Sequence, residues 1–501
     1  VVAGCSSDPA ASSADEGAIS AETKGGWTAA EREEFSHLAM GNETTPLAWL
    51  KALENDDGSS FVESLGRFGF LADKDSPSGL PVGIAVTNRA GVDYFGVTCA
   101  GCHIREVSYQ GKTLRIDGAP NMLSPEAFSR ALVGGVVATV SDPARLGRFA
   151  AKAMPGVPVA AVADALKTYL GRVAELKKIL PDGTPPGPGR SDSTTRASNI
   201  VFGAMDAQNV RAPVAPVAFM DLWGIEKRSW VQWTGDTNSV FERNMTAAFT
   251  STGRTDIILP ENLHRLERLT YKLDAPAWPA TFGALDASRV SAGKRIFADR
   301  CASCHESKIV NGVEDVHMSS LAEVGTDPGA STVWGLQVKG YKGQPDQPMP
   351  VAVADYIKTA KADLFAKYKI SDEKAREFEN GRTPVWRDMS AETGKAYPAR
   401  SLAGVWATAP YLHNDSVPTL EDLLKPASER PKSFPVGHTE YDPAKVGYRT
   451  DVPPIVTDAK GATTFDVTLP GNSNQGHEGP QFGTDLGKED RATLLEYLKS
   501  R

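Results

Sequence analysis

The chain has 501 residues, of which 41% are hydrophobic and 23% charged, and its formal net charge is −8. This length is too great for one ordinary hydrophobic core and predicts two or three domains. The negative charge argues against nucleic acid as a partner, because phosphate contacts need clustered Lys and Arg. The sequence contains no apolar run of the roughly 18 residues that a membrane-spanning helix needs. We therefore expect a soluble body that meets a membrane only through a lipid anchor.

The first 25 residues are predicted to be a lipoprotein cleavage site and a flexible tether. Cys5 ends the string Val2-Ala3-Gly4-Cys5, and in bacterial lipoprotein signals such small residues precede the lipidated cysteine. Residues 6–17 are small, polar and acidic, a composition that cannot bury a core. The alternative is an ordinary cysteine in a disordered tail. We expect an exported protein of a bacterium, either periplasmic or an outer-membrane or cell-surface lipoprotein.

Helical patterns dominate the next part of the chain. Two short helices are expected within 27–54, and longer ones at 125–133, 143–154 and 159–180, where apolar residues recur at helical spacing. Residues 109–118 predict a small β-hairpin with a glycine-containing turn.

A Pro- and Gly-rich loop at 181–189 separates these helices from a segment with three tryptophans. The tryptophans are Trp223, Trp230 and Trp233. Pro276 and Pro279 flank Trp278 and mark the expected start of a second domain. In that domain Asp286 is a suitable cap for a helix that runs to Cys301, and a last amphipathic helix is expected at 488–500.

Two C-x-x-C-H motifs carry the chemistry of this sequence. They are formed by Cys99, Cys102 and His103, and by Cys301, Cys304 and His305. Two cysteines three positions apart lie on one face of a helical turn, so both sulfurs can bind the vinyl groups of one haem, and the histidine supplies the proximal ligand. One motif alone also fits chance, a redox dithiol or part of a zinc site. Two complete copies, with Cys5 as the only other cysteine, predict two covalently bound haem c groups, here called haem 1 and haem 2.

The fold class follows from the helices around the second motif. In small cytochromes c the first and last helices cross at a glycine and a pair of aromatic side chains, and Gly293, Phe297 and Tyr497 are the candidates here. The predicted fold is mainly α, with two cytochrome c-like haem domains, large loop-rich insertions and a few short β-hairpins. The predicted units are the tether at 1–25, an N-terminal haem domain at 26–275 and a C-terminal cytochrome c-like haem domain at 276–501.

The sixth iron position decides whether a haem carries electrons or binds a substrate. For haem 2 the sequence offers two candidates: Met349, which is flanked by prolines, and His477, in a Gly- and Asn-rich loop before the last helix. Each also fits an ordinary loop role. For haem 1 the only plausible donor is His264, which is better explained as a helix surface or interface histidine, and Met122 is better explained as a core residue.

Five segments carry a resemblance to a known family: 99–118, 230–233, 403–424, 430–431 and 471–477, of which the part at 404–420 is the most specific. Together they resemble the dihaem c-type cytochromes typified by the rubber oxygenases of RoxA type. That group lies within the bacterial dihaem cytochrome c peroxidase and MauG-like superfamily. The resemblance covers most of the chain from about Phe68 onward.

The resemblance implies unequal haem sites. His103 would be the proximal ligand of an open, reactive iron, and His305 and His477 would together close haem 2. The family's distal pocket contains aromatic side chains, for which Trp223, Trp230 and Trp233 are the candidates, although each also suits a core or haem-wall position. His413 and Arg400 would contact the edge or propionates of haem 2, or act structurally.

The sequence therefore predicts a haem-dependent oxidoreductase, dioxygenase-like or peroxidase-like, with a reactive haem 1 and an electron-transferring haem 2. The expected partners are a redox protein or a small electron donor or acceptor, with O2, H2O2 or a hydrophobic substrate at haem 1. A peroxidase needs a distal acid–base residue, and no clear candidate lies near the first motif, which weakens that branch. The alternative is a non-catalytic dihaem electron-transfer cytochrome with His264 as an additional ligand. A sensor would need a signalling domain, and none is visible in the sequence.

Overall fold

The computed structural model describes residues 19–20, 26–76, 78–391, 394–454 and 464–501. Helix makes up 44% of it and strand 14%, so the predicted mainly α class with short β-hairpins is confirmed. Within the described residues, no helix combines the length and apolar character needed to cross a bilayer. Cys5 and the tether segment at 6–17 lie outside the described residues.

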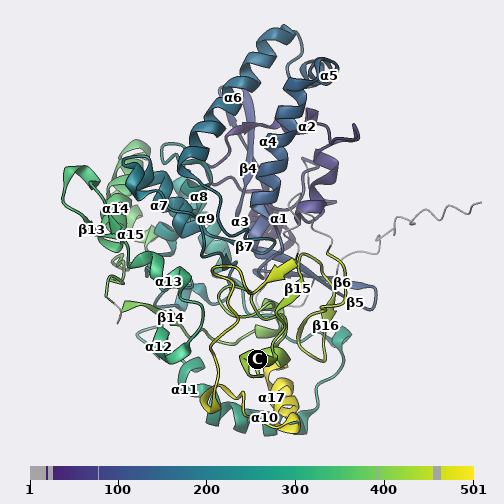
Figure 1. The fold of residues 1–501 in the computed structure, drawn as a ribbon, viewed down its shortest axis with the longest axis vertical. Coiled ribbons are helices and arrows are strands. Elements are labelled where there is room, and N and C mark those ends of the chain that lie inside the picture. The colour runs from purple at the N-terminus through teal and green to yellow at the C-terminus, as the bar shows by residue number, and fades with distance from the viewer. Residues whose placement is uncertain (1–18, 21–25, 77, 392–393, 455–463) are drawn as a thin grey trace, which may run out of the picture.

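Helices and short strands alternate along the chain (Figure 1). The α-helices are α1 (Ala29–His37), α2 (Leu47–Ala52), α3 (Cys99–His103), α4 (Pro125–Ser141), α5 (Pro143–Ala153), α6 (Val159–Ile179), α7 (Ser193–Ser198), α8 (Val240–Thr252), α9 (Pro260–Thr270), α10 (Ala287–Arg300), α11 (Ala302–His305), α12 (Leu321–Val324), α13 (Gly329–Trp334), α14 (Met349–Tyr368), α15 (Asp372–Phe378), α16 (Leu420–Leu423) and α17 (Lys488–Lys499). The strands are β1 (Ile19–Ser20), β2 (Thr45–Pro46), β3 (Ile84–Arg89), β4 (Val92–Val97), β5 (Ile104–Tyr109), β6 (Lys112–Asp117), β7 (Arg190–Ser191), β8 (Val217–Ala218), β9 (Lys308–Val310), β10 (Val313–Asp315), β11 (Met318–Ser320), β12 (Gln337–Val338), β13 (Gln347–Pro348), β14 (Ala396–Pro398), β15 (Ser433–Pro435), β16 (Tyr441–Asp442), β17 (Gly447–Tyr448) and β18 (Thr464–Asp466).

The predicted long helices are present as α4, α5 and α6, which form the top of the molecule in Figure 1. Helix α4 continues to Ser141, beyond the predicted end, although Gly134 and Gly135 interrupt its sequence. Leu132 and Val136 on either side of the glycines are buried, so packing outweighs the helix penalty of about 1 kcal/mol per glycine.

The predicted hairpin is formed by β5 and β6, which pair antiparallel from Ile104–Asp117 to Tyr109–Lys112. Gln110 and Gly111 connect them and both have positive φ, at 51° and 76°, as a two-residue hairpin turn requires. The hairpin is longer than predicted because β5 begins directly after His103, at the end of α3. Strand β5 therefore sets the direction of the chain directly after the first motif.

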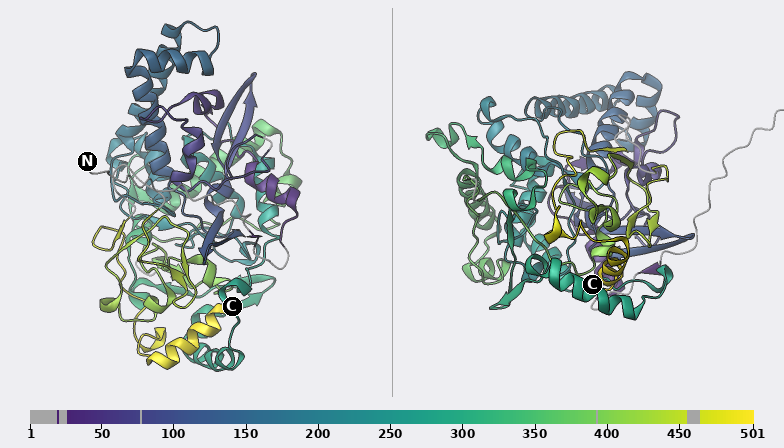
Figure 2. Two further views of the ribbon diagram at one scale, coloured as in Figure 1. Left: turned by 90° about the vertical axis from the view of Figure 1, so that its right-hand side faces the viewer. Right: turned by 60° about the horizontal axis from the view of Figure 1, so that its bottom comes forward.

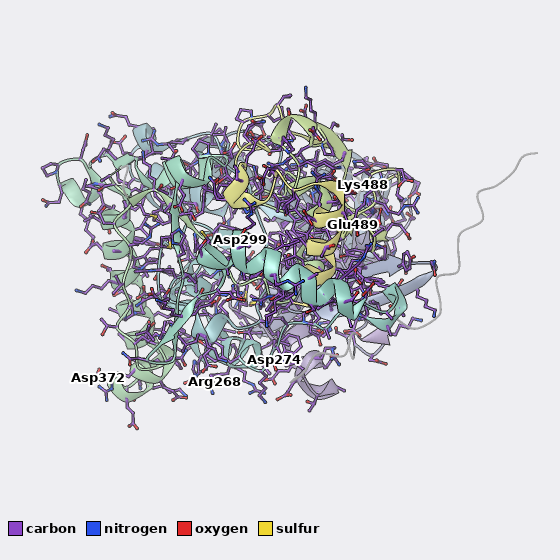
Figure 3. All side chains as sticks on the ribbon, turned by 90° about the horizontal axis from the view of Figure 1, so that it is seen from below. Arg268, Asp274, Asp299, Asp372, Lys488 and Glu489 are labelled. Atoms are coloured by element: carbon purple, nitrogen blue, oxygen red, sulfur yellow. The ribbon has the colours of Figure 1, made fainter. Side chains whose placement is uncertain are left out.

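The crossing of α10 and α17 was predicted and is confirmed. The Asp286 carboxylate accepts hydrogen bonds from the backbone N–H groups of Ser288 and Arg289 at the start of α10. The Phe297 and Tyr497 rings pack with centroids 5.2 Å apart. Figure 3 shows the two helices side by side on the underside, and Figure 2 shows them at the end of the molecule opposite α5 and α6.

The largest hydrophobic cluster runs through the molecule from Trp27 to Leu498 and includes residues on both sides of the predicted boundary at 275/276. A second cluster lies among α2, α4, α5 and α6. The domain boundary stays a prediction, and the core beneath it is continuous. The segments that follow the two motifs are thus held against one another by shared packing.

Candidate functional sites

The first motif occupies α3, a single helical turn that packs directly on the start of β3. A Cβ atom on Gly83 would lie 2.3 Å from the Cα atom of Gly101, so the backbones touch at the glycines. Burial raises the pKa of the Cys99 thiol to about 11 and that of Cys102 to about 12. A redox dithiol needs an accessible thiolate, so these environments favour thioether formation over dithiol chemistry.

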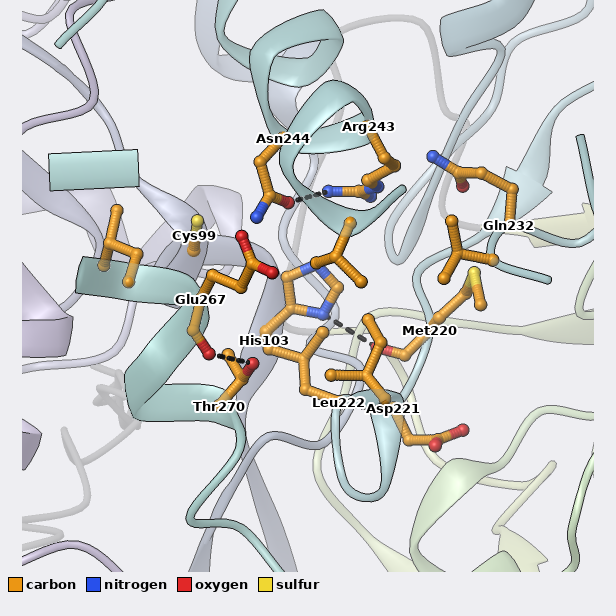
Figure 4. Close-up of a pocket in the computed structure, with 14 residues that line it drawn as sticks. Cys99, His103, Met220, Asp221, Leu222, Gln232, Arg243, Asn244, Glu267 and Thr270 are labelled. Atoms are coloured by element: carbon orange, nitrogen blue, oxygen red, sulfur yellow. Dashed lines mark hydrogen bonds between the residues drawn. The ribbon is translucent and has the colours of Figure 1, made fainter. Parts of the chain in front are cut away.

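His103 is held in the orientation of a metal ligand. Its ring is buried, and its Nδ1 lies 2.7 Å from the backbone carbonyl oxygen of Met220. Burial, aided by the charge of Arg243, lowers the pKa of His103 to about 3. The imidazole is therefore neutral, Nδ1–H donates to Met220, and the second ring nitrogen points toward Arg243 and Asn244 (Figure 4).

A small cavity of about 30 Å³ lies against Cys99 and His103, enough for one or two water-sized molecules. Helices α8 and α9 and the segment at 220–232 form its walls (Figure 4). It is lined by Cys99, His103, Met220, Asp221, Leu222, Ile225, Val231, Gln232, Val240, Arg243, Asn244, Leu266, Glu267 and Thr270. The polar side chains Gln232, Arg243, Asn244 and Glu267 were not predicted from the sequence.

Glu267 is the acidic side chain most deeply enclosed in this wall. It is 1% exposed, and its Oε1 accepts hydrogen bonds from the Tyr271 hydroxyl and from Asn380 Nδ2, the latter at 3.3 Å. Its Oε2 is buried without a hydrogen-bond partner among the described residues. Burial raises the pKa of Glu267 to about 8, so the side chain carries a proton at neutral pH. It also lines a second, smaller cavity of about 10 Å³.

The three tryptophans predicted for the haem 1 pocket lie outside the lining of this cavity. The indole N–H of Trp223 donates to the carbonyl of Ala403 at 2.9 Å, and that of Trp233 donates to Ala218 at 2.8 Å. Gln232 has a φ of 71°, and this turn brings Gln232 to the cavity, while Trp230 packs beside Gly235.

His264 lies on α9 one turn before Glu267 but is absent from the cavity lining. Its ring packs against Phe378 with centroids 4.8 Å apart, and its Nε2 lies 3.4 Å from a carboxylate oxygen of Glu377. Met122 is buried in the core, next to Gly189. His264 is thus buried at a helix interface, 6% exposed, and not on the helix surface, and Met122 lies in the core.

The second motif lies at the end of α10 and in α11. Cys301 and Cys304 are partly exposed, and Nδ1 of His305 donates to the backbone carbonyl of Arg400 at 2.8 Å. Burial lowers the pKa of His305, so this imidazole is also neutral. Its environment matches that of His103 in one respect: a backbone carbonyl fixes Nδ1 and leaves Nε2 for a metal.

His477 faces His305 across a gap of the size that one metal ion requires. Their ring centroids are 6.3 Å apart. Two imidazole nitrogens on opposite sides of one metal lie about 4 Å apart, and the ring centres are farther apart than the nitrogens. Burial lowers the pKa of His477 to about 3, and its buried Nδ1 has no hydrogen-bond partner among the described residues.

The loop that carries His477 is fixed by Arg430. The guanidinium donates to the carbonyls of Asn474 at 2.6 Å, Gly476 at 2.9 Å and His477 at 3.1 Å. Gly476 has a φ of 77°, and a Cβ atom there would lie 2.2 Å from the carbonyl carbon of Gly325. The Gly- and Asn-rich sequence of this loop is therefore needed for its close packing.

Met349, the other candidate ligand of haem 2, begins α14 and is 2% exposed within the main core. Its backbone N–H donates to the carbonyl of Leu336 at 2.9 Å. Of the two earlier suggestions for the surroundings of haem 2, Arg400 contacts His305 through its carbonyl, as described above. His413 instead stacks on Tyr397 with centroids 4.2 Å apart.

Comparison with known proteins places this geometry in a family. Residues 396–435 match the model of the family described as RoxA-like, cytochrome c-like, and this segment contains Arg400, His413 and Arg430. The chain is 31% identical over 568 residues to the uncharacterized protein y4iJ of Sinorhizobium fredii (strain NBRC 101917 / NGR234), a match that covers 95% of this chain and 92% of the relative. It is also 29% identical over 298 residues to the uncharacterized protein y4iM of the same strain, covering 56% of this chain and 63% of that protein. The chain is thus a haem cytochrome with a RoxA-like, cytochrome c-like segment, and it belongs to the same family as protein y4iJ.

Proposed function

We propose that this protein is a dihaem oxidoreductase in which haem 1, held by His103, reacts with a small oxygen species, and haem 2, held by His305 and His477, transfers electrons. The observation that carries the proposal is the difference between the two histidine sites. The ring of His305 lies opposite that of His477, with the ring centroids 6.3 Å apart, whereas His103 adjoins a cavity with polar side chains. Two strong axial ligands suit electron transfer, and an open position suits substrate binding.

The residues around His103 suit a haem whose sixth position is open. The backbone carbonyl of Met220 is bonded to Nδ1 and so is not available to the nitrogen that would bind iron. Arg243 and Asn244, toward which that nitrogen points (Figure 4), are not usual haem ligands. This arrangement favours the enzyme over the electron-carrier alternative, whose only predicted donor, His264, packs elsewhere.

Among oxygen species, the polar lining favours peroxide. Haem iron, when bound, would supply the redox chemistry, and reduction of H2O2 to two waters takes up two electrons and two protons. Glu267 holds a proton at neutral pH and has an unpartnered oxygen in the cavity, which provides the acid–base group that a peroxidase needs. Tyr271 and Asn380 orient its other oxygen, and the positive charge of Arg243 favours an oxygen that gains negative charge.

Dioxygen-dependent oxidation of a hydrophobic substrate is the second candidate. The RoxA-like segment at 396–435 supports it, as do the apolar members of the lining, such as Leu222, Val231 and Leu266. This chemistry does not need Glu267 as the acid–base group that peroxide reduction requires. Substitution of Glu267 therefore separates the two candidates.

Steady-state reduction of H2O2 by the purified dihaem protein, with a reduced electron donor, tests the proposal. We expect Glu267→Gln to lower the rate by about 10²- to 10⁴-fold, because it removes the acid–base group and keeps the side-chain shape. The control is Glu261→Gln on the same helix, whose side chain is 58% exposed and which should leave the rate unchanged. Activity that is absent in the wild type, or unchanged in Glu267→Gln, would overturn the peroxide assignment.

We also propose that the protein acts outside the cytoplasm, attached through Cys5, with a redox protein or small molecule as its electron partner. Support comes from the small residues before Cys5 and from covalent haem attachment, which takes place after export. Cell fractionation tests the anchor: Cys5→Ser should move the protein from the membrane fraction to the released fraction. Retention of the variant in the membrane fraction would contradict the anchor.

A further inference from the structure

The proximal histidines of the two motifs are tied to neighbouring points of one polar network. Nδ1 of His103 donates to the carbonyl of Met220 at 2.7 Å, and Nδ1 of His305 donates to the carbonyl of Arg400 at 2.8 Å. The hydrogen bond to Nδ1 sets the orientation and basicity of a metal-bound imidazole. Whatever fixes these two carbonyls therefore acts on both haem sites.

One ion pair joins them. Asp221 follows Met220 directly, and its Oδ1 lies 2.8 Å from a guanidinium nitrogen of Arg400. The other carboxylate oxygen of Asp221 accepts from Arg228, which also donates to the backbone carbonyl of Asp221 at 3.3 Å. Arg400 in addition lies over the ring of Trp233, 4.9 Å from its centroid. The path from His103 to His305 thus runs through Met220, Asp221 and Arg400 without a gap.

The pair is buried and charged. The side chains of Arg400 and Asp221 are only 12% and 11% exposed, and Asp221 also lines the haem 1 cavity. Burial alone raises the pKa of Asp221, but Arg400 and Arg228 outweigh it and hold that pKa below its ordinary value. Burial lowers the pKa of Arg400 to about 10, so it is protonated at neutral pH. Two guanidinium groups and one carboxylate give the trio one net positive charge.

Stability alone does not account for such a group. A buried ion pair is often no more stabilising than apolar side chains of the same volume, because desolvation of the charges offsets their attraction. The trio instead lies where its charge and geometry act on two metal ligands at once. A fixed positive charge near an iron favours the reduced, less positive state.

We propose that Asp221 and Arg400 are positioning residues shared by both haems, and that a change in their charge moves the reduction potentials of haem 1 and haem 2 together. This inference rests on the proposed function insofar as both motifs must carry haem. It adds that the two sites are coupled on their proximal sides, through residues that lie far apart in the sequence.

Redox titration of the purified dihaem protein, followed by absorption and by the electron paramagnetic resonance signal of each haem, tests this coupling. Asp221→Asn removes a negative charge, so both midpoint potentials should shift upward. Arg400→Gln removes a positive charge and keeps the carbonyl that bonds His305, so both should shift downward. The double variant has the wild-type net charge and should return both potentials toward their wild-type values. It also keeps the proposal testable if Asp221→Asn alone folds poorly.

The control is Glu54→Gln, which breaks another Arg–carboxylate pair, Arg148–Glu54, whose arginine lies on α5, and which should move neither potential. A shift of only one haem, or shifts of the same sign in Asp221→Asn and Arg400→Gln, would overturn the proposal. A haem assay on the same samples separates the two claims: fewer than two haems per chain in the wild type defeats the proposed function. Two haems with independent potentials defeat only the coupling.

Discussion

Glu267 illustrates at the scale of one residue how burial prepares a side chain for proton transfer. It lies on α9 among Leu263, Leu266 and Leu269, all of which are buried, so its carboxyl is drawn into the apolar face of the helix. Desolvation opposes the charged form and is the main reason that its pKa rises to about 8. The side chain is neutral at pH 7 and becomes charged above pH 8.

This shift gives peroxide reduction a defined pH dependence. The proton-donating form of Glu267 is present below about pH 8 and is lost as the pH rises through that value, so the rate should fall on the alkaline side. The ordinary pKa is 4.5, so between that value and about 8 the folded protein binds more protons than the unfolded chain, and the free energy of unfolding should decrease as the pH rises. Rate–pH profiles of the wild type and Glu267→Gln check the predicted fall in rate, and an alkaline limb that persists in the variant would contradict that prediction.

The proposed covalent and proximal haem residues could be predicted from the sequence because C-x-x-C-H places them within one helical turn. The cavity residues were not, because Arg243, Asn244 and Glu267 come from α8 and α9 and meet His103 only through tertiary packing. One signal was available: a glutamate at a core-facing position of an otherwise apolar helix face. The W-x-x-W segment pointed to its tryptophans, and in the structure Gln232, which lies between them in the sequence, lines the cavity.

At the scale of elements, the crossing of α10 and α17 depends on a missing side chain. A Cβ atom on Gly293 would lie 2.3 Å from the carbonyl oxygen of Thr493 and 2.7 Å from Cβ of Tyr497. The Cα atom of Gly293 therefore occupies the contact point, and Phe297 packs on Tyr497 one turn farther along. Since α11 follows α10 directly, this contact also positions His305.

We predict that Gly293→Ala destabilises the protein by about 1–3 kcal/mol, because overpacking at the crossing forces the helices apart. The matched control is Gly134→Ala in α4, where an added Cβ atom meets nothing within 4 Å. Alanine at that site should stabilise the protein by about 0.5–1 kcal/mol through its higher helix propensity. Denaturant unfolding of both variants is the measurement, and equal effects of the two substitutions would refute the crossing argument.

Helix and hairpin positions were predictable wherever a cap, a periodic apolar face or a Gly-containing turn marked them, as at Asp286 and at Gln110-Gly111. The irregular segments were not. The stretch at 404–420 forms short turns held by long-range bonds, such as those from Asn414 Nδ2 to the carbonyls of Gly471 and Ser473 at 3.0 Å. No local periodicity encodes such contacts, so only the resemblance to a family pointed to this region.

At the scale of the whole molecule, the two matched motifs lie in different surroundings. His103 is 5% exposed, whereas His305 and His477 are partly exposed. Helix α11, which ends at His305, lies with α10 at the end of the molecule opposite α5 and α6 (Figure 1). An interior reactive site and a peripheral electron-transfer site suit the proposed division of labour, because the electron partner needs access only to the second. The continuous core and the Asp221–Arg400 pair hold the two sites in one body.

Carbon monoxide binding to the reduced protein tests this inequality most directly, because the ligand binds only to ferrous haem with an open or weakly held sixth position. We predict one carbon monoxide for every two haems in the wild type. His477→Ala should open the sixth position of haem 2, so that two carbon monoxide molecules bind for every two haems. Met349→Leu should leave the number at one for every two haems. Carbon monoxide binding to neither haem, or to both haems of the wild type, would contradict the account.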